Sequence, residues 1–241
     1  MAPRLRGRSV NEVTDPIADI AERAAGAGID LAAVTAVGRY NETVDERFRL
    51  PGSGRATVVV LGNTRALWPY IDRFVVDAKA PVDDPVDTYV TRAVRDAITE
   101  AGVTPIDVRF DFEPPERRIA IQQLADVAGL AWLSPSHLCV HPIYGPWIAL
   151  RAAVVLDVDA PIDDGPASAP CDCRRHCGPA LETALAAGEP TNQAELREHW
   201  RLWLAVRDAC PVGREHRYTA EQIVYHYAGV RPAHWPPGRP M

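Results

Sequence analysis

The chain has 241 residues, of which 47% are hydrophobic, and this length and composition fit one large α/β domain or one domain with an appendage. Its formal net charge is −6 and it has no lysine- or arginine-rich run, which argues against a nucleic-acid-binding protein. No apolar stretch approaches about 18 residues and no apolar segment follows the basic N-terminus, so we expect a cytoplasmic protein without a membrane span or a secretory signal.

The first hundred residues contain alternating signals for helices and strands. Asp15-Pro16 and Asp84-Pro85 each place an N-cap residue before a proline at the first helical position, so each predicts a helix start. Short apolar runs predict strands, and apolar residues at helical spacing predict helices. The elements predicted here are, in chain order, a helix at 15–26, strands at 31–37 and 56–61, and helices at 67–75 and 84–102.

The next part adds a half-buried strand, a helix and an apolar region that contains one charge. Residues 106–112 alternate apolar and charged side chains, and residues 119–129 have helical spacing. Two apolar runs, 138–140 and 147–156, flank a turn-rich segment, which predicts a buried strand pair around a functional loop. Arg151 lies inside the second run, and a buried arginine costs several kcal/mol unless a polar or anionic group meets it.

The chain changes character after Asp157. Residues 160–169 are rich in proline, aspartate and glycine, which predicts a boundary, and the sequence beyond them is typical of short helices. We therefore divide the chain into an α+β core, residues 1–157, and a cysteine-containing helical region, residues 158–241, packed on that core. The order of elements predicts an α+β fold with a mostly antiparallel sheet flanked by helices and a helical C-terminal third.

Four of the five cysteines gather in the C-terminal region, as Cys171, Cys173 and Cys177 in one segment and Cys210 further on. An odd count in a reducing compartment favours metal ligation or catalysis over disulfides. Four thiolates can complete a tetrahedral zinc site or hold an iron–sulfur cluster. The gaps of one and three residues differ from the common zinc and ferredoxin motifs, so thiols without a ligand remain the alternative interpretation.

Several polar side chains could also carry chemistry. His141 could be a ligand or an acid–base group, although a lone histidine more often hydrogen-bonds a turn. Arg151, Arg207 and Arg231 could bind an anionic ligand through paired hydrogen bonds, or form ordinary ion pairs. The sequence contains no P-loop, no GxGxxG and no GxSxG, so nucleotide-phosphate loops and hydrolase elbows have no support.

A resemblance to a known protein family rests on short motifs that occur in a fixed order over about residues 36–231. They are Tyr40-Asn41, Asp84-Pro-Val-Asp87, Val127-Ala-Gly129, Cys139-Val-His141-Pro, Gly145-x-Trp147, Ala149-x-Arg151, His199-Trp200-Arg201-x-Trp203, Arg207-Asp208-Ala209 and Arg217-Tyr218. No single motif is specific, but together they resemble the methylmalonic aciduria and homocystinuria type C protein family, the cyanide-eliminating cyanocobalamin reductases. The resemblance implies a fold similar to the flavin-dependent nitroreductases, with a large cavity for a corrin ring. It also implies removal of the upper axial ligand of cobalamin, by a glutathione thiolate for alkyl groups and by reduction for cyanide.

The resemblance further implies ligand contacts. The cobalamin-binding residues that it implies are Ile119, Ala120, Ile121, Gln122, Cys139 and Leu150. The implied glutathione-binding residues are Arg151, Arg207 and Arg231, and arginines suit the two carboxylates of that tripeptide. It implies cobalamin, with FMN as a source of electrons, and glutathione or another low-molecular-weight thiol as co-substrate. A reductase or a cobalamin-accepting protein would be the protein partner.

The cysteine cluster departs from the animal members of this family. It is similar to the clusters of epoxyqueuosine reductases and reductive dehalogenases, which join a cobalamin domain to ferredoxin-like clusters. If Cys171, Cys173, Cys177 and Cys210 hold iron–sulfur, electrons could come from there instead of from flavin. Three hypotheses follow: an enzyme that removes the upper ligand of cobalamin, a cobalamin- or flavin-dependent reductase fed by the cysteines, and a non-catalytic cobalamin carrier.

Overall fold

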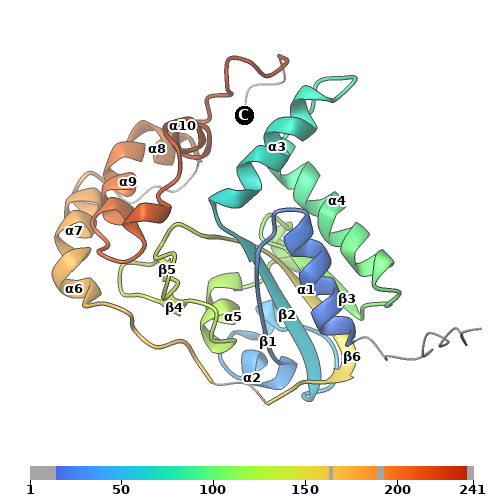
Figure 1. Ribbon diagram of the computed structural model, residues 1–241. Coiled ribbons are helices and arrows are strands. Elements are labelled where there is room, and N and C mark those ends of the chain that lie inside the picture. Colours follow the sequence, from blue (N-terminus) through green and yellow to red (C-terminus); the bar gives the residue numbers. More distant parts are fainter. Residues whose placement is uncertain (1–14, 163–164, 189–192, 238–241) are drawn as a thin grey trace, which may run out of the picture.

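A four-stranded antiparallel sheet organises the fold (Figure 1). The structure is a computed structural model that describes residues 15–162, 165–188 and 193–237. The strand order is β1-β2-β6-β3, with β1 (Leu31–Ala36), β2 (Ala56–Asn63), β3 (Asp107–Phe110) and β6 (Ala149–Asp159). Each neighbouring pair is antiparallel, which confirms the predicted α+β class.

Helices cover both faces of this sheet (Figure 1). One face carries α1 (Pro16–Gly26), α3 (Trp68–Val76) and α4 (Pro85–Glu100), and the other carries α2 (Val37–Asn41) and α5 (Ile121–Val127). Every residue of β2 is buried. Its Val59 and Leu61 join the core under α1, α3 and α4, whereas Val58 and Val60 join the core under α5. A strand covered on both sides requires a continuous apolar run, which is what residues 56–61 provide.

The rest of the chain forms a small sheet and a group of short helices. The small sheet pairs β4 (Trp132–Leu133) with β5 (Cys139–Val140). The C-terminal helices lie to one side of the main sheet (Figure 1): α6 (Cys173–His176), α7 (Gly178–Ala186), α8 (Gln193–Glu198), α9 (Trp200–Asp208) and α10 (Ala220–Ala228). Single 3-10 turns are η1 (Glu46–Phe48), η2 (Arg65–Leu67), η3 (Pro115–Arg117) and η4 (Arg214–His216).

The two apolar runs around residues 138–156 do not pair with each other, so the predicted strand pair is wrong. β5 pairs with β4, whereas β6 lies between β2 and β3. Both edges of β6 are therefore hydrogen-bonded within the main sheet, and no edge is left for β5. A single bridge between His141 and Gly145 closes the loop that joins the two strands.

Two local predictions also need correction. The strand predicted at 31–37 ends at Ala36, and Tyr40 lies in α2, where its hydroxyl donates to the Phe48 carbonyl at 3.1 Å. Asp84 does precede α4, but its φ is 43° and its side chain accepts no hydrogen bond from the first turn. Aspartate tolerates this left-handed region better than most residues, so Asp84 acts through its backbone rather than as a side-chain cap.

The division of the chain at residue 157 stays a prediction, since β6 itself runs two residues further, to Asp159. Among the helices that the structure describes, none combines the length and the apolar character that crossing a membrane requires.

Candidate functional site

Arg151 lies in β6 and is only 8% exposed. Its Nε donates a 2.7 Å hydrogen bond to Oδ1 of Asn63, the last residue of the neighbouring β2. One guanidinium nitrogen lies 3.9 Å from Oδ2 of Asp111, just after β3. The polar groups that a buried arginine requires therefore come from the chain itself, as an amide and a carboxylate.

Two carboxyl groups near Arg151 have raised pKa values. Burial raises the pKa of Asp111 to about 6, while the charge of Arg151 lowers it and the charge of Asp87 raises it further. Burial also raises the pKa of Asp87, again against the effect of Arg151. Carboxyl groups with raised pKa values beside a cation are concentrated at functional sites, because burial and fixed charges are what tune chemistry there.

A cavity of about 310 Å³ opens on one side of this arginine. It is bounded by the start of α4, by β6, by α8 and by α10, and its lining residues are Asp84, Val86, Asp87, Arg151, Arg197, Tyr225 and His226. Burial lowers the pKa of His226 to about 3, and the charges of Arg151 and Arg207 add to this effect. His226 is therefore neutral at physiological pH, and the fixed charges of this cavity are carried by aspartates and arginines.

A second cavity, of about 230 Å³, lies beside the first. It brings together Asp111, Ile121, Gln122, Leu138, Cys139, Pro146, Ile148, Ala149, Leu150 and Arg207. The family resemblance associates six residues with cobalamin, and four of them line this cavity: Ile121, Gln122, Cys139 and Leu150. Of the other two, Ile119 is buried in the sheet core, and the backbone N–H of Ala120 donates to the hydroxyl of Tyr40 at 3.1 Å.

Arg207 reaches the second cavity from α9. Its guanidinium carbon lies 5.9 Å from the ring centres of Trp147 and Tyr218 and 5.8 Å from that of Tyr227, a setting that favours a cation. Its Nε is buried and finds no hydrogen-bond partner among the described residues. A buried donor of this kind is costly to leave unpaired, so it marks a place where a ligand oxygen would be stabilised.

Arg231 lies outside the set of residues that line either cavity. One of its terminal nitrogens donates to the Val82 carbonyl at 3.1 Å, two residues before Asp84 of the first cavity. Its Nε and its other terminal nitrogen are buried and have no partner in the described part of the chain. The three predicted arginines thus occupy different positions: Arg151 in the first cavity, Arg207 in the second, and Arg231 behind the loop that leads into α4.

His141 organises a turn, which was the commoner of the two interpretations. Its Nδ1 accepts backbone N–H groups of Ile143 and Tyr144 at 3.1 and 3.2 Å, and burial lowers its pKa. The loop is fixed further at Gly145, where a Cβ atom would lie 2.0 Å from the Val212 carbonyl oxygen. Only glycine permits this approach between the loop and the segment that follows Cys210.

Cys171, Cys173, Cys177 and Cys210 converge in one cluster beside α7 and α9. All four are free thiols, and the Cys173 thiol donates to the hydroxyl oxygen of Ser136 at 3.1 Å. Within the ranges that the structure describes, no group of three or more His, Cys, Asp or Glu side chains meets the requirements of a metal site as it stands. Cys139 is separate from this cluster, and burial raises its pKa to about 12.

Asn63 and Asp111 are site residues that sequence reasoning did not select. Asn63 ends β2, and its side-chain oxygen accepts a hydrogen bond from Arg151. Asp111 belonged to the alternating run at 106–112, where a charged residue is ordinary. The available signal was the buried Arg151 itself, because two flanking strands must supply its partners.

Comparisons with known proteins place this architecture. Residues 29–233 match the methylmalonic aciduria and homocystinuria type C family. Among curated proteins, the chain is 32% identical over 213 residues to a human protein named "Cyanocobalamin reductase / alkylcobalamin dealkylase", covering 77% of this chain and 68% of the relative. The mouse protein of the same name is 30% identical over 209 residues, covering 77% and 69%.

Solved structures share the fold. The C. elegans B12-trafficking protein CblC superposes with a TM-score of 0.67 at 19% identity, covering 90% of this chain and 91% of that one. The epoxyqueuosine reductase of Streptococcus thermophilus gives a TM-score of 0.52 at 10% identity, covering 88% and 75%. The match to the family extends over most of the chain, from the start of β1 to beyond α10. The chain therefore belongs to the methylmalonic aciduria and homocystinuria type C family.

Proposed function

We propose that this protein binds cobalamins at the second cavity and removes their upper axial ligand, by reductive decyanation and by thiol-dependent dealkylation. The observation that carries the proposal is the convergence of Ile121, Gln122, Cys139 and Leu150 with Arg207 on one cavity. These residues come from α5, β5, β6 and α9, so distant parts of the sequence meet there. The curated relatives at 30–32% identity carry the corresponding names, cyanocobalamin reductase and alkylcobalamin dealkylase.

The lining of this cavity suits a ring with an apolar face and polar edges. Ile121, Ile148 and Leu150 supply apolar surface, and Gln122 lies among them as a polar group. Its volume of about 230 Å³ is below the roughly 300–1,000 Å³ of typical ligand pockets. Cobalamin is larger than most ligands, so binding requires the elements around the cavity to separate. We therefore expect the protein to change shape when it binds cobalamin.

For the thiol, we propose that Arg207 and Arg231 bind the carboxylates of glutathione, with Arg151 as the fixed cation between the two cavities. Arg207 and Arg231 both have buried nitrogens without a partner among the described residues, and carboxylate oxygens would satisfy them. Arg151 already donates to Asn63, so it contributes charge more than free hydrogen-bonding capacity. Its pair with Asp111 also connects the cavities, since Arg151 lines one and Asp111 lines the other.

In the dealkylation, the thiolate sulfur bonds to the alkyl carbon, the cobalt–carbon bond breaks, and its electron pair stays on cobalt. The protein's part is to hold the thiol and the cobalamin in a geometry from which this displacement proceeds. The decyanation requires an electron from outside. We assign no described residue to FMN, so we propose that a reduced flavin from solution or a reductase partner supplies that electron. A cytoplasmic location, where glutathione and free cysteines are both maintained, is part of this proposal.

Absorption spectroscopy tests the binding step. Purified protein mixed with methylcobalamin should shift the cobalamin spectrum, because displacement of the lower base changes the ligand field of cobalt. Added glutathione should then convert methylcobalamin to its dealkylated product. An unchanged spectrum at saturating protein would overturn the assignment of the cavity to cobalamin.

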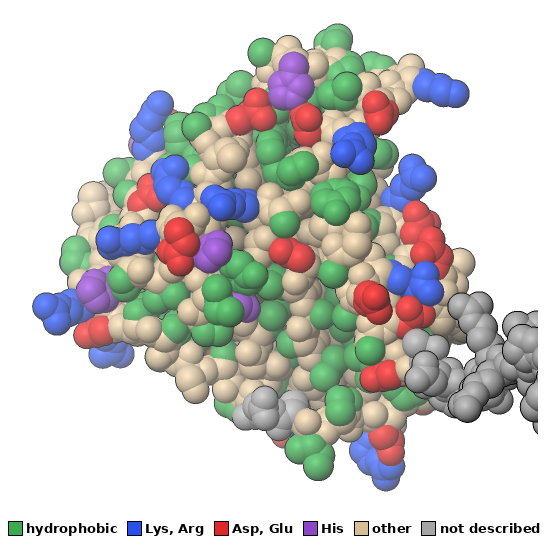
Figure 2. Space-filling model, in the orientation of Figure 1, with side chains coloured by type: hydrophobic (Ala, Val, Ile, Leu, Met, Phe, Trp, Pro, Cys, Tyr) green, Lys and Arg blue, Asp and Glu red, His purple; other side chains and the backbone are tan. Residues whose placement is uncertain are grey.

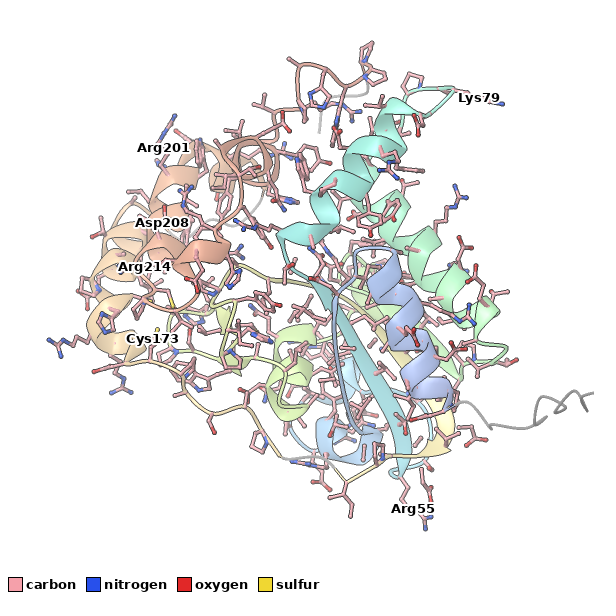
Figure 3. The ribbon with its side chains drawn as sticks, viewed as in Figure 1. Arg55, Lys79, Cys173, Arg201, Asp208 and Arg214 are labelled. Carbon is pink, nitrogen blue, oxygen red and sulfur yellow. The ribbon has the colours of Figure 1, made fainter. Side chains whose placement is uncertain are left out.

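Arg207→Ala tests the thiol step. A lost charge-assisted hydrogen bond is worth about 1.5–3 kcal/mol, so the rate of dealkylation at low glutathione should fall roughly 10- to 100-fold. The spectral shift with methylcobalamin should persist. Arg201→Ala is the matched control, because Arg201 is on the same helix but is exposed and lies over Trp200 (Figure 3). Equal rates for both variants would remove Arg207 from the thiol site.

A carrier without catalytic activity is the second candidate function, favoured by the small size of the cavity and by the similarity in fold to a B12-trafficking protein. A carrier would shift the cobalamin spectrum without removing the ligand when glutathione and a reduced flavin are supplied. It would instead pass its cobalamin to an acceptor protein. The dealkylation assay therefore separates the two functions.

A further inference from the structure

Cysteines make up much of the fully buried part of the cluster around Cys171, Cys173, Cys177 and Cys210, which we call the thiol cluster. Its other fully buried residues are Val140, Ala184 and Val206. Three of the six fully buried side chains here are thus cysteines, and the remaining three are small. The helices they support are also short, with four residues in α6 and nine in α7. Helices of this length depend on tertiary contacts for their stability.

The four sulfur atoms come from two segments that the fold brings together. Cys171 precedes α6, Cys173 begins it and Cys177 follows it, whereas Cys210 follows α9. Cys173, Cys177 and Cys210 are at most 2% exposed, whereas Cys171 is partly exposed at the edge. Three thiols are therefore shielded from solvent, and the fourth lies at the edge of the same cluster.

Several basic side chains lie near the thiol cluster, together with the acidic Asp172. Arg214 donates from its Nε to the Cys210 carbonyl at 3.2 Å, and α6 carries Arg174 and Arg175 on its exposed side. Figure 3 places Cys173 and Arg214 on the same flank of the molecule, and Figure 2 shows basic side chains gathered over this flank. Four thiolates around a divalent ion carry a net charge of −2, and nearby cations offset such a charge.

The thiol cluster lies directly behind the wall of the second cavity. Successive residues of a strand point to opposite sides, and β5 has only two. Cys139 lines the cavity, whereas Val140 packs against the thiol cluster. Just after α9, the backbone N–H of Cys210 donates to the carbonyl of Arg207, which lines the cavity, at 3.2 Å. A centre in the thiol cluster would therefore fix two walls of the cavity.

We propose that Cys171, Cys173, Cys177 and Cys210 bind a thiophilic metal centre, a zinc ion or an iron–sulfur cluster, through four thiolates. The chemistry of the donor set fits, since closed sites of four cysteines are typical of structural zinc and of iron–sulfur clusters. The structure describes free thiols, of which that of Cys173 donates to the Ser136 hydroxyl oxygen at 3.1 Å. Binding of a zinc ion replaces four S–H protons with four zinc–sulfur bonds, and the protons go to solvent.

Metal analysis of the intact protein tests this proposal without cobalamin. The full chain is purified anaerobically, and zinc, iron and acid-labile sulfide are measured per chain. One zinc per chain identifies a zinc site, and iron with matching sulfide identifies a cluster. A chain with neither metal, five titratable thiols and no uptake of added zinc or of reconstituted iron and sulfide would overturn the proposal. A disulfide in place of the metal would overturn it equally.

Cysteine variants locate the centre. Cys177→Ser should lose the metal, whereas Cys139→Ser, at a buried cysteine outside the thiol cluster, should retain it. Because Cys177→Ser risks misfolding, Cys171→Ser at the partly exposed edge is the second variant, and it should bind metal at least 10-fold more weakly. Equal metal content in Cys171→Ser, Cys177→Ser and Cys139→Ser would contradict the assignment. The methylcobalamin shift is recorded separately, so failure of the cavity assignment and failure of this proposal are distinguishable.

Discussion

The sheet core and the thiol cluster are stabilised in different ways. Both faces of the sheet bury large branched side chains in continuous layers, such as Leu61 on one face and Leu124 on the other. The thiol cluster buries three cysteines with one alanine and two valines. Large apolar side chains are thus fully buried in the sheet core, whereas around the thiol cluster the large ones, such as Trp132 and Leu181, are only partly buried.

The sheet core and the thiol cluster also contribute differently to the two cavities. The sheet supplies rigid positions for Arg151, Asn63 and Asp111, because β2, β6 and β3 are hydrogen-bonded in register. The helices beside the thiol cluster supply Arg207, whose side chain projects from the end of a nine-residue helix.

Removal of metal should give the largest effect and act on one region only. Structural zinc contributes about 10–16 kcal/mol in isolated zinc-finger peptides, far more than a single side chain. Treatment with a chelator should therefore abolish the hydrogen-exchange protection of α6, α7 and the end of α9 while β2 and β6 stay protected. Exchange that rises equally in the sheet would show that the two regions unfold together.

Leu61→Ala should test the sheet core in the same way. Leu61 is fully buried in the central strand, and such a substitution costs roughly 2–5 kcal/mol of unfolding free energy. Urea denaturation should show this loss with and without bound metal. The conservative Leu61→Met should cost much less, because it nearly preserves volume. A loss that depends on metal would contradict the independence of the two regions.

The sheet could be predicted from the sequence because its signals are local. The run at 56–61 is apolar without interruption, and it forms a strand buried on both faces. The pairing of β5 could not be predicted in this way, since a two-residue strand leaves no periodicity and its partner depends on which edges remain free. The helix α2, which contains Tyr40, could not be predicted for a similar reason, because a five-residue helix is too short to show a pattern.

The candidate site was only partly predictable. The buried Arg151 indicated that polar partners must exist. Their identity, Asn63 and Asp111, depends on the register of three strands, which no local sequence pattern contains. The family resemblance identified residues of the second cavity, including Cys139 and Arg207. It could do so because it draws on the ligand contacts of related proteins and not on the helix or strand propensity of this sequence. The four cysteines of the thiol cluster were grouped from their positions in the sequence, but their convergence depends on how α6 and α9 pack.

Arg151→Met should show how far the stability of the sheet depends on the buried charge of Arg151. The substitution keeps most of the volume but leaves Asn63 without its donor and Asp111 without its cation. Leaving the buried Asn63 amide unsatisfied costs roughly 1–3 kcal/mol, measurable by urea denaturation at pH 7. The double variant Arg151→Met/Asp111→Asn should recover part of the loss, since it also removes the unpaired carboxylate. A double variant no more stable than the single one would show that Asp111 does not sense Arg151.

Asp111→Asn should give the smallest effect and a characteristic dependence on pH. The pKa of Asp111 is raised to about 6 in the folded protein, above its value in the unfolded chain, so the folded state binds the proton more tightly. This contribution to stability is fully present below about pH 4, the unfolded value, and is lost as the pH rises through about 6. Asparagine removes the titration, so the variant should gain stability relative to the native protein between pH 4 and pH 7. Since the Asp111 side chain is 32% exposed, we expect a relative change of only about 1 kcal/mol. Urea midpoints for both proteins at pH 4, 6 and 8 measure it, and a difference that is constant with pH would mean that water, and not the sheet, sets the charge of this carboxyl.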